Sequence, residues 1–126
     1  MTKEEVLYIH QILIEKFGGA TGVRDNKALE AAINRPYATF DKRELYPSAI
    51  DKAAAILESI VVNHPFQDGN KRTGYTLMRL ILMQSGYDIA SDQDEKYNFV
   101  LSISLGEMDI DQIKAWIKRS LVHHKL

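Results

Sequence analysis

Eleven residues between two long apolar runs constrain the fold of this 126-residue chain more than any other feature. They cover residues 64–74 and read His-Pro-Phe-Gln-Asp-Gly-Asn-Lys-Arg-Thr-Gly. Pro65 disfavours helix at His64, and Gly69 relaxes the backbone that follows. One helix should therefore stop just before His64, and a new one should begin near Asn70. The sequence predicts two apolar helices joined by a tight loop that contains the histidine.

The start of the second helix is a predicted anion site. Its first backbone N–H groups, at Asn70, Lys71 and Arg72, lack helical partners, and its positive dipole end faces the loop. The Lys71 and Arg72 side chains add fixed positive charge. Phosphate-group transfer needs cations that hold phosphates, a carboxylate such as Asp68 for Mg²⁺, and a base such as His64 for the incoming hydroxyl. We therefore interpret the loop as a phosphate-transfer site.

Each of these residues taken alone also has a structural explanation, since a lone histidine or a Lys-Arg pair at a helix start is often inert. Their combination within one loop carries the interpretation. Gly69 and Gly74 have the spacing of a P-loop, but Tyr75 and Thr76 follow where that motif needs Lys and Ser/Thr. The preceding run also has a helical rather than a strand pattern, so the sequence disfavours a Walker-type ATPase.

The stretch resembles the active-site motif of Fic-fold proteins, His-x-Phe-x-Asp/Glu-Gly-Asn-Gly-Arg-x-x-Arg. Lys71 stands where adenylylating Fic enzymes have their second glycine, and Tyr75 stands where they have their second arginine. Both departures match the death-on-curing (Doc) toxins, whose motif is similar to His-x-Phe-x-Asp-Ala-Asn-Lys-Arg. Gly69 departs from the Doc pattern toward Fic.

The resemblance implies a Fic-fold helical domain over residues 1–126, with an irregular flap beside the active-site loop. It also implies ATP as the substrate, with Mg²⁺. The implied site residues are His64, Asp68 and Arg72 for catalysis, Gly69, Asn70, Lys71 and Arg72 for the nucleotide phosphates, and Asp68 for the metal. Phe66 is interpreted as a core anchor of the loop.

Doc-like proteins are thought to bind ATP the other way round from adenylylating Fic enzymes and to transfer its γ-phosphoryl group to elongation factor Tu. Lys71 would fill the space that the phosphates occupy in the Fic pose. The resemblance therefore implies a toxin-like protein kinase that inhibits translation. Two alternatives stay open: an adenylyl transferase acting on a protein hydroxyl, because Gly69 is Fic-like, and a catalytically silent binding module with the same fold.

A toxin of this kind needs restraint. Some Fic proteins carry an inhibitory helix with the pattern Ser/Thr-x-x-x-Glu-Gly/Asn, but the nearest string here, residues 91–95, is followed by Lys96. By resemblance to Doc, the partner is a small antitoxin whose disordered C-terminal segment folds on binding. We expect it to use an apolar groove beside the flap.

Apolar spacing and capping residues predict six helices and no confident strand, hence an all-α domain. The first two expected helices cover residues 3–17 and 26–34. A third begins after the cap Ser48 and ends at about residue 63, and the fourth, over residues 70–84, is the central buried helix. A fifth is capped by Ser91, and a sixth is capped by Asp109 and reaches Leu121. Residues 35–47 lack a clean period and read as a surface flap. Its aromatic residues Tyr37, Phe40 and Tyr46 either bind a target or pack into the core.

Three further residues have open or minor interpretations. His10 lies on the apolar side of the first helix and is interpreted as a core histidine with a hydrogen-bond partner. Arg24, in a segment that also resembles Doc-like proteins, is either a contact near the site or an inert loop arginine. A metal site at His123 and His124 has weak support from spacing alone.

Composition excludes several classes of function. The formal net charge is −1, so there is no global basic field for nucleic acid. The chain has no cysteine, which excludes disulfides, thiol catalysis and Cys-ligated zinc. No apolar run approaches a membrane span, and the first residues do not resemble a signal peptide. We therefore expect a cytoplasmic protein.

Overall fold

The computed structural model describes residues 1–124, within which six α-helices make up most of the chain. They are α1 Lys3–Phe17, α2 Asn26–Asn34, α3 Ala49–Asn63, α4 Asn70–Gln84, α5 Gln93–Ser104 and α6 Ile110–Ser120. The predicted all-α class is confirmed, and four of the expected helices, over residues 3–17, 26–34, 70–84 and from the cap Ser48 to residue 63, have the observed bounds. The last two residues of the expected domain lie outside the described part of the chain.

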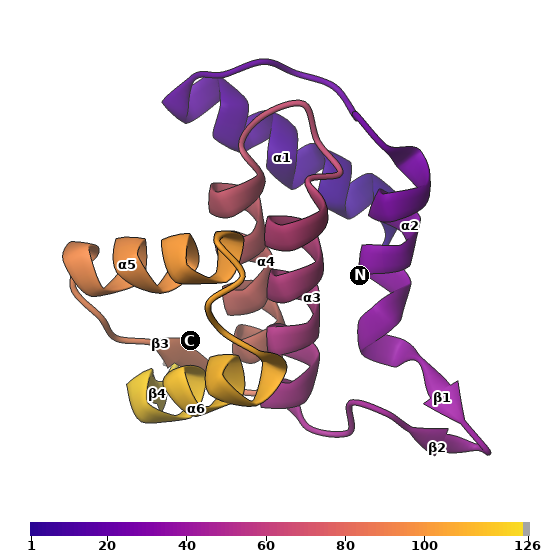
Figure 1. Cartoon of the computed structure of the whole chain (residues 1–126), viewed down its shortest axis with the longest axis vertical. Coiled ribbons are helices and arrows are strands. Elements are labelled where there is room, and N and C mark those ends of the chain that lie inside the picture. The colour runs from indigo at the N-terminus through magenta and orange to yellow at the C-terminus, as the bar shows by residue number, and fades with distance from the viewer. Residues whose placement is uncertain (125–126) are drawn as a thin grey trace.

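Helices α3 and α4 form the centre of the fold, and the predicted active-site loop joins them (Figure 1). Helix α3 packs against α2, α4, α5 and α6, and its buried residues run from Ala53 to Val61. Helix α4 is central and buried, as expected, and α3 shares this position, because each of the two helices has eight buried residues. Small residues allow this close packing: a Cβ on Gly74 of α4 would lie 3.0 Å from a methyl group of Val61.

Helix α1 crosses the end of the α3–α4 pair that carries the connecting loop (Figure 1). Its N-cap is Thr2, whose hydroxyl accepts the backbone N–H of Glu5. The face of α1 that packs inward carries Val6, His10 and Ile14. This face brings α1 against α4 and the loop.

The structure also contains four short strands, which the sequence did not predict. A 3₁₀ turn, η1 Arg35–Tyr37, precedes β1 Thr39–Phe40 and β2 Arg43–Glu44, and the second pair is β3 Tyr87–Ile89 with β4 Leu121–His123. Strands of two or three residues are too short to show a period of two. The sixth helix was expected to reach Leu121, which is wrong. The helix ends at Ser120, because Leu121 already pairs with Ile89 in the second pair of strands.

The predicted flap over residues 35–47 is an ordered antiparallel hairpin rather than an irregular segment. Asp41 and Lys42 at its tip both have positive φ angles, as a type I′ turn requires. Phe40 and Tyr37 are exposed, so they do not pack into the core.

The position of the hairpin differs from the expectation that it lies beside the active-site loop. The ammonium of Lys52, in the first turn of α3, pairs with Glu44 at 3.0 Å and donates to the carbonyl of Tyr46. The loop follows the last residue of the same helix, which lies about 16 Å from Lys52 at 1.5 Å per residue. The hairpin therefore extends from the other end of α3 (Figure 1), because the short connection from β2 ties it to the start of that helix.

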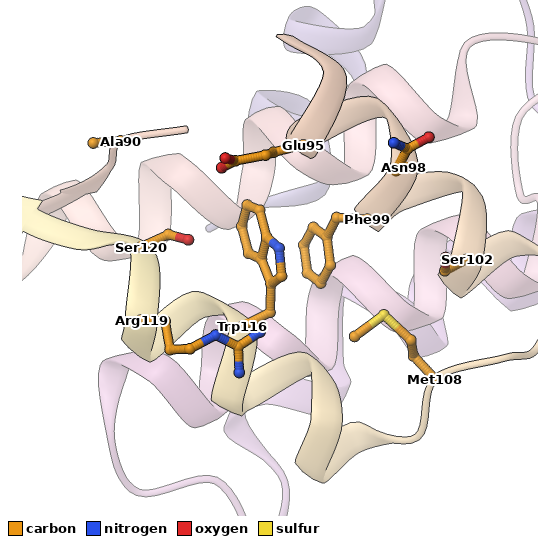
Figure 2. A pocket seen from close by; sticks show the side chains of 9 residues that line it. All are labelled: Ala90, Glu95, Asn98, Phe99, Ser102, Met108, Trp116, Arg119 and Ser120. Atoms are coloured by element: carbon orange, nitrogen blue, oxygen red, sulfur yellow. The ribbon is translucent and has the colours of Figure 1, made fainter. Parts of the chain in front are cut away.

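Helices α5 and α6 cover the remaining side of the core. The N-cap of α5 is Asp92, which accepts the backbone N–H of Glu95, and not Ser91 as predicted. Trp116 of α6 stacks on Phe99 of α5 with ring centroids 3.7 Å apart. The two rings border a shallow cavity of about 630 Å³ on the surface (Figure 2). Within residues 1–124, no helix has the length and hydropathy that a bilayer span requires.

Leu57 tests the role of α3 as the centre of the core. Its side chain is fully buried, whereas Val62 on the same helix is 45% exposed. We expect Leu57→Ala to lower the free energy of unfolding by about 2–5 kcal/mol, because it leaves a cavity between packed helices. Val62→Ala should change it by about 0.5 kcal/mol or less. Urea unfolding of both variants measures the difference, and equal losses would contradict the packing.

Candidate active site

Two left-handed backbone positions shape the loop between α3 and α4. His64 is the C-cap of α3, with φ +48° and ψ +60°, and Gly69 is the N-cap of α4, with φ +74°. A left-handed conformation is uncommon for a residue with a side chain and needs support from its surroundings. A Cβ on Gly69 would also lie 3.1 Å from the Ile14 side chain, so the loop is close to α1 at this point.

The segment before α2 supports the loop through backbone hydrogen bonds. Val23 and Phe66 form an isolated antiparallel bridge. The N–H groups of Arg24 and Asp25 both donate to the carbonyl of Pro65, at 2.8 and 3.0 Å, and the N–H of Gln67 donates to Gly22. A segment forty residues earlier in the chain thus pairs with the loop like a short strand.

The Arg24 side chain adds a second connection to the same region. Its Nε donates to the carbonyl of His64 at 2.6 Å, and its Nη2 donates to the carbonyl of Asn63 at 2.7 Å. These carbonyls belong to the last turn of α3, where no helical partner follows. Of the two interpretations of Arg24, the structure supports a contact at the site, because the guanidinium holds the peptide group of the predicted base.

Phe66 and His10 fix the loop from the core side. Phe66 is fully buried, as its interpretation as an anchor requires, and it stacks on the His10 ring at 3.8 Å. The Nε2 of His10 lies 2.8 Å from the carbonyl of Asp68. A carbonyl oxygen only accepts, so Nε2 carries the proton in this contact. The interpretation of His10 as a core histidine with a partner is confirmed.

The Asn70 side chain has a structural role in the loop. Its Oδ1 accepts the N–H of Phe66 and its Nδ2 donates to the carbonyl of Phe66, both at 3.0 Å. The side chain is buried and closes the loop into a ring. Asn70 also lines the cleft, and its predicted contact with phosphate stays a prediction. The backbone N–H of Asn70 still belongs to the first turn of α4.

The Asp68 carboxylate is exposed and faces the cleft, yet it is held in place. Oδ1 accepts the N–H of Gly69 at 2.8 Å, and Oδ2 accepts the N–H of Ala20 at 3.1 Å. These two backbone hydrogen bonds lower the pKa of Asp68 below its usual value, so the group is ionised at neutral pH. Among residues 1–124, no group of three or more acidic or histidine side chains forms a metal cage.

A cleft of about 880 Å³ opens in front of the loop. Helices α1, α4 and α5 form its walls, and the predicted site residues His64, Asp68, Gly69, Asn70, Lys71 and Arg72 all line it. Lys71 and Arg72 are exposed there, and the Arg72 guanidinium lies 4.0 Å from the centroid of the Phe17 ring. The predicted roles of Lys71 and Arg72 in binding the phosphates of a nucleotide are not tested by this geometry and stay predictions.

The first turn of α4 lines this cleft, and its first N–H groups have no partner within the helix. Gly69 offers no side chain, so α4 has no side-chain cap within the described residues. The imidazole of His64 is exposed at the same place, and none of its ring nitrogens makes a hydrogen bond to residues 1–124. The arrangement can hold an anion at the helix start, with a free base beside it.

The third wall of the cleft, formed by α5, was not predicted from the sequence. Gln93, Lys96, Tyr97 and Val100 of α5 line it, together with Arg79 of α4. Their i, i+3, i+4, i+7 spacing was visible in the sequence and marks one face of a helix. Nothing local indicated that this face would lie opposite a loop thirty residues away.

Comparison with known proteins agrees with this geometry. The model of the Fic/DOC family matches residues 1–82, which is more than half of the chain. The chain therefore belongs to the Fic/DOC family, as the motif resemblance implied.

Within that family, the chain is similar over nearly its whole length to two proteins named Doc. It is 37% identical over 117 residues to Toxin Doc of Mycolicibacterium smegmatis, covering 91% of this chain and 88% of that protein. It is 26% identical over 119 residues to the protein kinase doc of Escherichia phage P1, covering 94% and 93%. A protein adenylyltransferase fic-1 of Caenorhabditis briggsae is 34% identical over 77 residues, which are 61% of this chain but 15% of that protein.

Asn70 tests the internal structure of the loop. We expect Asn70→Ala to lower the free energy of unfolding by about 1–3 kcal/mol, because it leaves the buried N–H and carbonyl of Phe66 without partners. Asn98→Ala, at an exposed position of α5, is the matched control. Thermal unfolding without nucleotide measures both. A loss seen only in nucleotide binding, with unchanged stability, would contradict this structural role and support the predicted phosphate contact.

Proposed function

We propose that this protein is a Doc-type toxin that transfers the γ-phosphoryl group of ATP to a hydroxyl group of a protein target. The observation that carries the proposal is the juxtaposition of a free His64 imidazole with the uncapped start of α4, where Lys71 and Arg72 line the same cleft. By resemblance to Doc, the target is elongation factor Tu and the effect is inhibition of translation. Such a target implies a cytoplasmic location.

The proposed reaction assigns one step to each group. His64 accepts the proton of the target hydroxyl as its oxygen attacks the γ-phosphorus. The bond from that phosphorus to the β–γ bridging oxygen breaks, and ADP leaves with the bonding electrons. The first N–H groups of α4, with Lys71 and Arg72, stabilise the negative charge on the phosphoryl oxygens.

Asp68 fits the predicted Mg²⁺ ion. Mg²⁺ at nucleotide sites usually takes one or two carboxylates together with phosphate oxygens and water. Asp68 is ionised, and it lines the cleft beside the start of α4. Its two backbone hydrogen bonds leave acceptor capacity on both oxygens. When bound, the ion would neutralise part of the phosphate charge.

Adenylyl transfer is the second candidate, because Gly69 follows the Fic pattern and one relative is an adenylyltransferase. Two residues favour phosphoryl transfer. Lys71 adds a long side chain at the start of α4, where the Fic motif has glycine, and Tyr75 stands in place of the second arginine. The relatives that cover nearly the whole chain are both named Doc, and one of them is a protein kinase.

Separately labelled ATP distinguishes the two reactions. The wild-type chain is incubated with purified elongation factor Tu and ATP labelled at the γ or the α position. We expect label from the γ position alone on the target. His64→Ala should abolish transfer without loss of the fold, because His64 lies outside the helices and its side chain packs against nothing in the core. His123→Ala, at an exposed position of β4, is the matched control and should stay active.

The same assay contains the outcomes that contradict the proposal. Label from the α position on the target would establish adenylyl transfer instead. Full activity in the His64→Ala protein would overturn the assignment of the base. Lys71→Gly should weaken phosphoryl transfer and admit adenylyl transfer if Lys71 controls the nucleotide pose, whereas unchanged kinetics would refute that control.

A small antitoxin is the proposed inhibitor, and two walls of the cleft, α1 and α5, offer it apolar side chains. Leu13 and Phe17 of α1 face this cleft, as do Tyr97 and Val100 of α5. Phe17 and Tyr97 are 51% and 64% exposed, so both rings are accessible to a partner. The antitoxin groove was expected beside the flap, but these apolar side chains border the motif loop. An amphipathic helix laid on them would cover the base and the cations together.

Expression of the chain in bacteria tests the toxin assignment. We expect growth arrest that requires His64 and is relieved by co-expression of the neighbouring small reading frame. The His64→Ala chain is the matched control and should accumulate without arrest. Normal growth at high levels of folded wild-type protein would count against the toxin, and arrest by His64→Ala would show that the effect is not catalytic.

A further inference from the structure

The wall of the cleft formed by α5 carries a cationic side chain that does not belong to the motif. Lys96 of α5 lines the cleft, and its ammonium lies 5.1 Å above the centroid of the Tyr75 ring. Tyr75 is buried in α4, so its ring is a rigid support. Contact with an aromatic face restrains the position of an ammonium without neutralising its charge.

The charges around Lys96 leave it without an anionic partner. Within the described residues it forms no ion pair. The other cations of the cleft are Lys71, Arg72 and Arg79, and Arg79 is already bound to Asp88 by two hydrogen bonds of 2.8 Å. Asp68 is the one carboxylate among the described lining residues. The cleft is therefore strongly positive in a chain whose formal net charge is −1.

The spacing along α4 relates Lys96 to the start of that helix. Tyr75 follows Lys71 by four residues and Arg72 by three, so the ring beneath Lys96 lies one helical turn, about 5.4 Å, beyond the two cations. A chain of phosphates anchored at the first turn and running along α4 would reach the ammonium of Lys96. A single phosphate bound at the helix start would not.

We propose that Lys96 is a second phosphate contact, supplied by α5, that binds the polyphosphate chain of the nucleotide and sets the direction in which it lies along α4. This inference rests on the proposed function, since it concerns the same cleft. It adds a residue outside the motif: the first turn of α4 holds one end of the triphosphate, and Lys96 holds it one turn further along. The repulsion between Lys96 and the cations of α4 is relieved when the polyanion is bound.

Binding of a non-hydrolysable ATP analogue, adenylyl imidodiphosphate, with Mg²⁺ tests Lys96 without any catalytic step. Isothermal titration of the full chain would compare the wild type with Lys96→Met, which keeps the length of the side chain but removes the charge. We expect Kd to rise about tenfold, as for the loss of one charge-assisted hydrogen bond. Lys96→Arg should retain most of the affinity. Lys118→Met, at an exposed position of α6, is the matched control and should leave Kd unchanged.

Two further probes identify the part of the ligand that Lys96 contacts. Inorganic triphosphate should lose affinity for Lys96→Met by a similar factor, because the proposed contact is to phosphate alone. Adenosine, which has no phosphate, should bind both proteins equally. A larger loss for adenosine than for triphosphate would overturn the proposal and assign Lys96 to the nucleoside.

The remaining outcomes separate this inference from the proposed function. If the wild type binds the analogue and Lys96→Met binds it within twofold, the inference is wrong and the proposed function is unaffected. If the wild type does not bind the analogue at all, the nucleotide-dependent function fails, and the role of Lys96 fails with it. Equal losses of affinity in Lys96→Met and Lys118→Met would show that the effect comes from the net charge of the protein. This result would also contradict the inference.

Discussion

The site depends on backbone hydrogen bonds that hold the loop between α3 and α4 in an unusual shape. Five consecutive or nearly consecutive carbonyls, those of residues 63–66 and 68, accept hydrogen bonds from other parts of the structure. The donors come from the segment before α2, from His10 of α1, and from the Asn70 side chain. A loop of this length would otherwise expose these groups to water and sample many conformations. Its rigidity keeps His64 left-handed and beside the start of α4.

Local signals explain why so much of the helical fold could be predicted from the sequence. Thr2, Asp25, Ser48 and Asp109 each cap the helix that follows, and the apolar spacing marks the face that packs inward. These signals act over three to seven residues. The mistaken cap at Ser91 is an error of the same local kind, because the adjacent Asp92 offers a carboxylate at the position that reaches the N–H of Glu95.

The features that could not be predicted depend on contacts between distant segments. Residue types alone placed a base, a carboxylate and two cations in one loop, and the structure brings them to one cleft. Residue types could not reveal that the Asn70 amide forms hydrogen bonds with the backbone of Phe66, or that the Arg24 side chain donates to carbonyls at the end of α3. The strands and the position of the hairpin are also products of tertiary pairing. An alternation over two or three residues carries too little information to be read in advance.

The caps also explain how the fold leaves one helix start available for chemistry. Among the six helices of the described chain, α4 alone lacks a side-chain cap, because Gly69 takes that position. A carboxylate or hydroxyl there would bind the N–H groups of the first turn and compete with a phosphate for them. The amide group of Asn70 makes two hydrogen bonds to the backbone of Phe66 and does not cap α4. A side-chain cap would stabilise the start of α4. The hydrogen bonds that fix the loop stabilise it instead, and the anion site stays open.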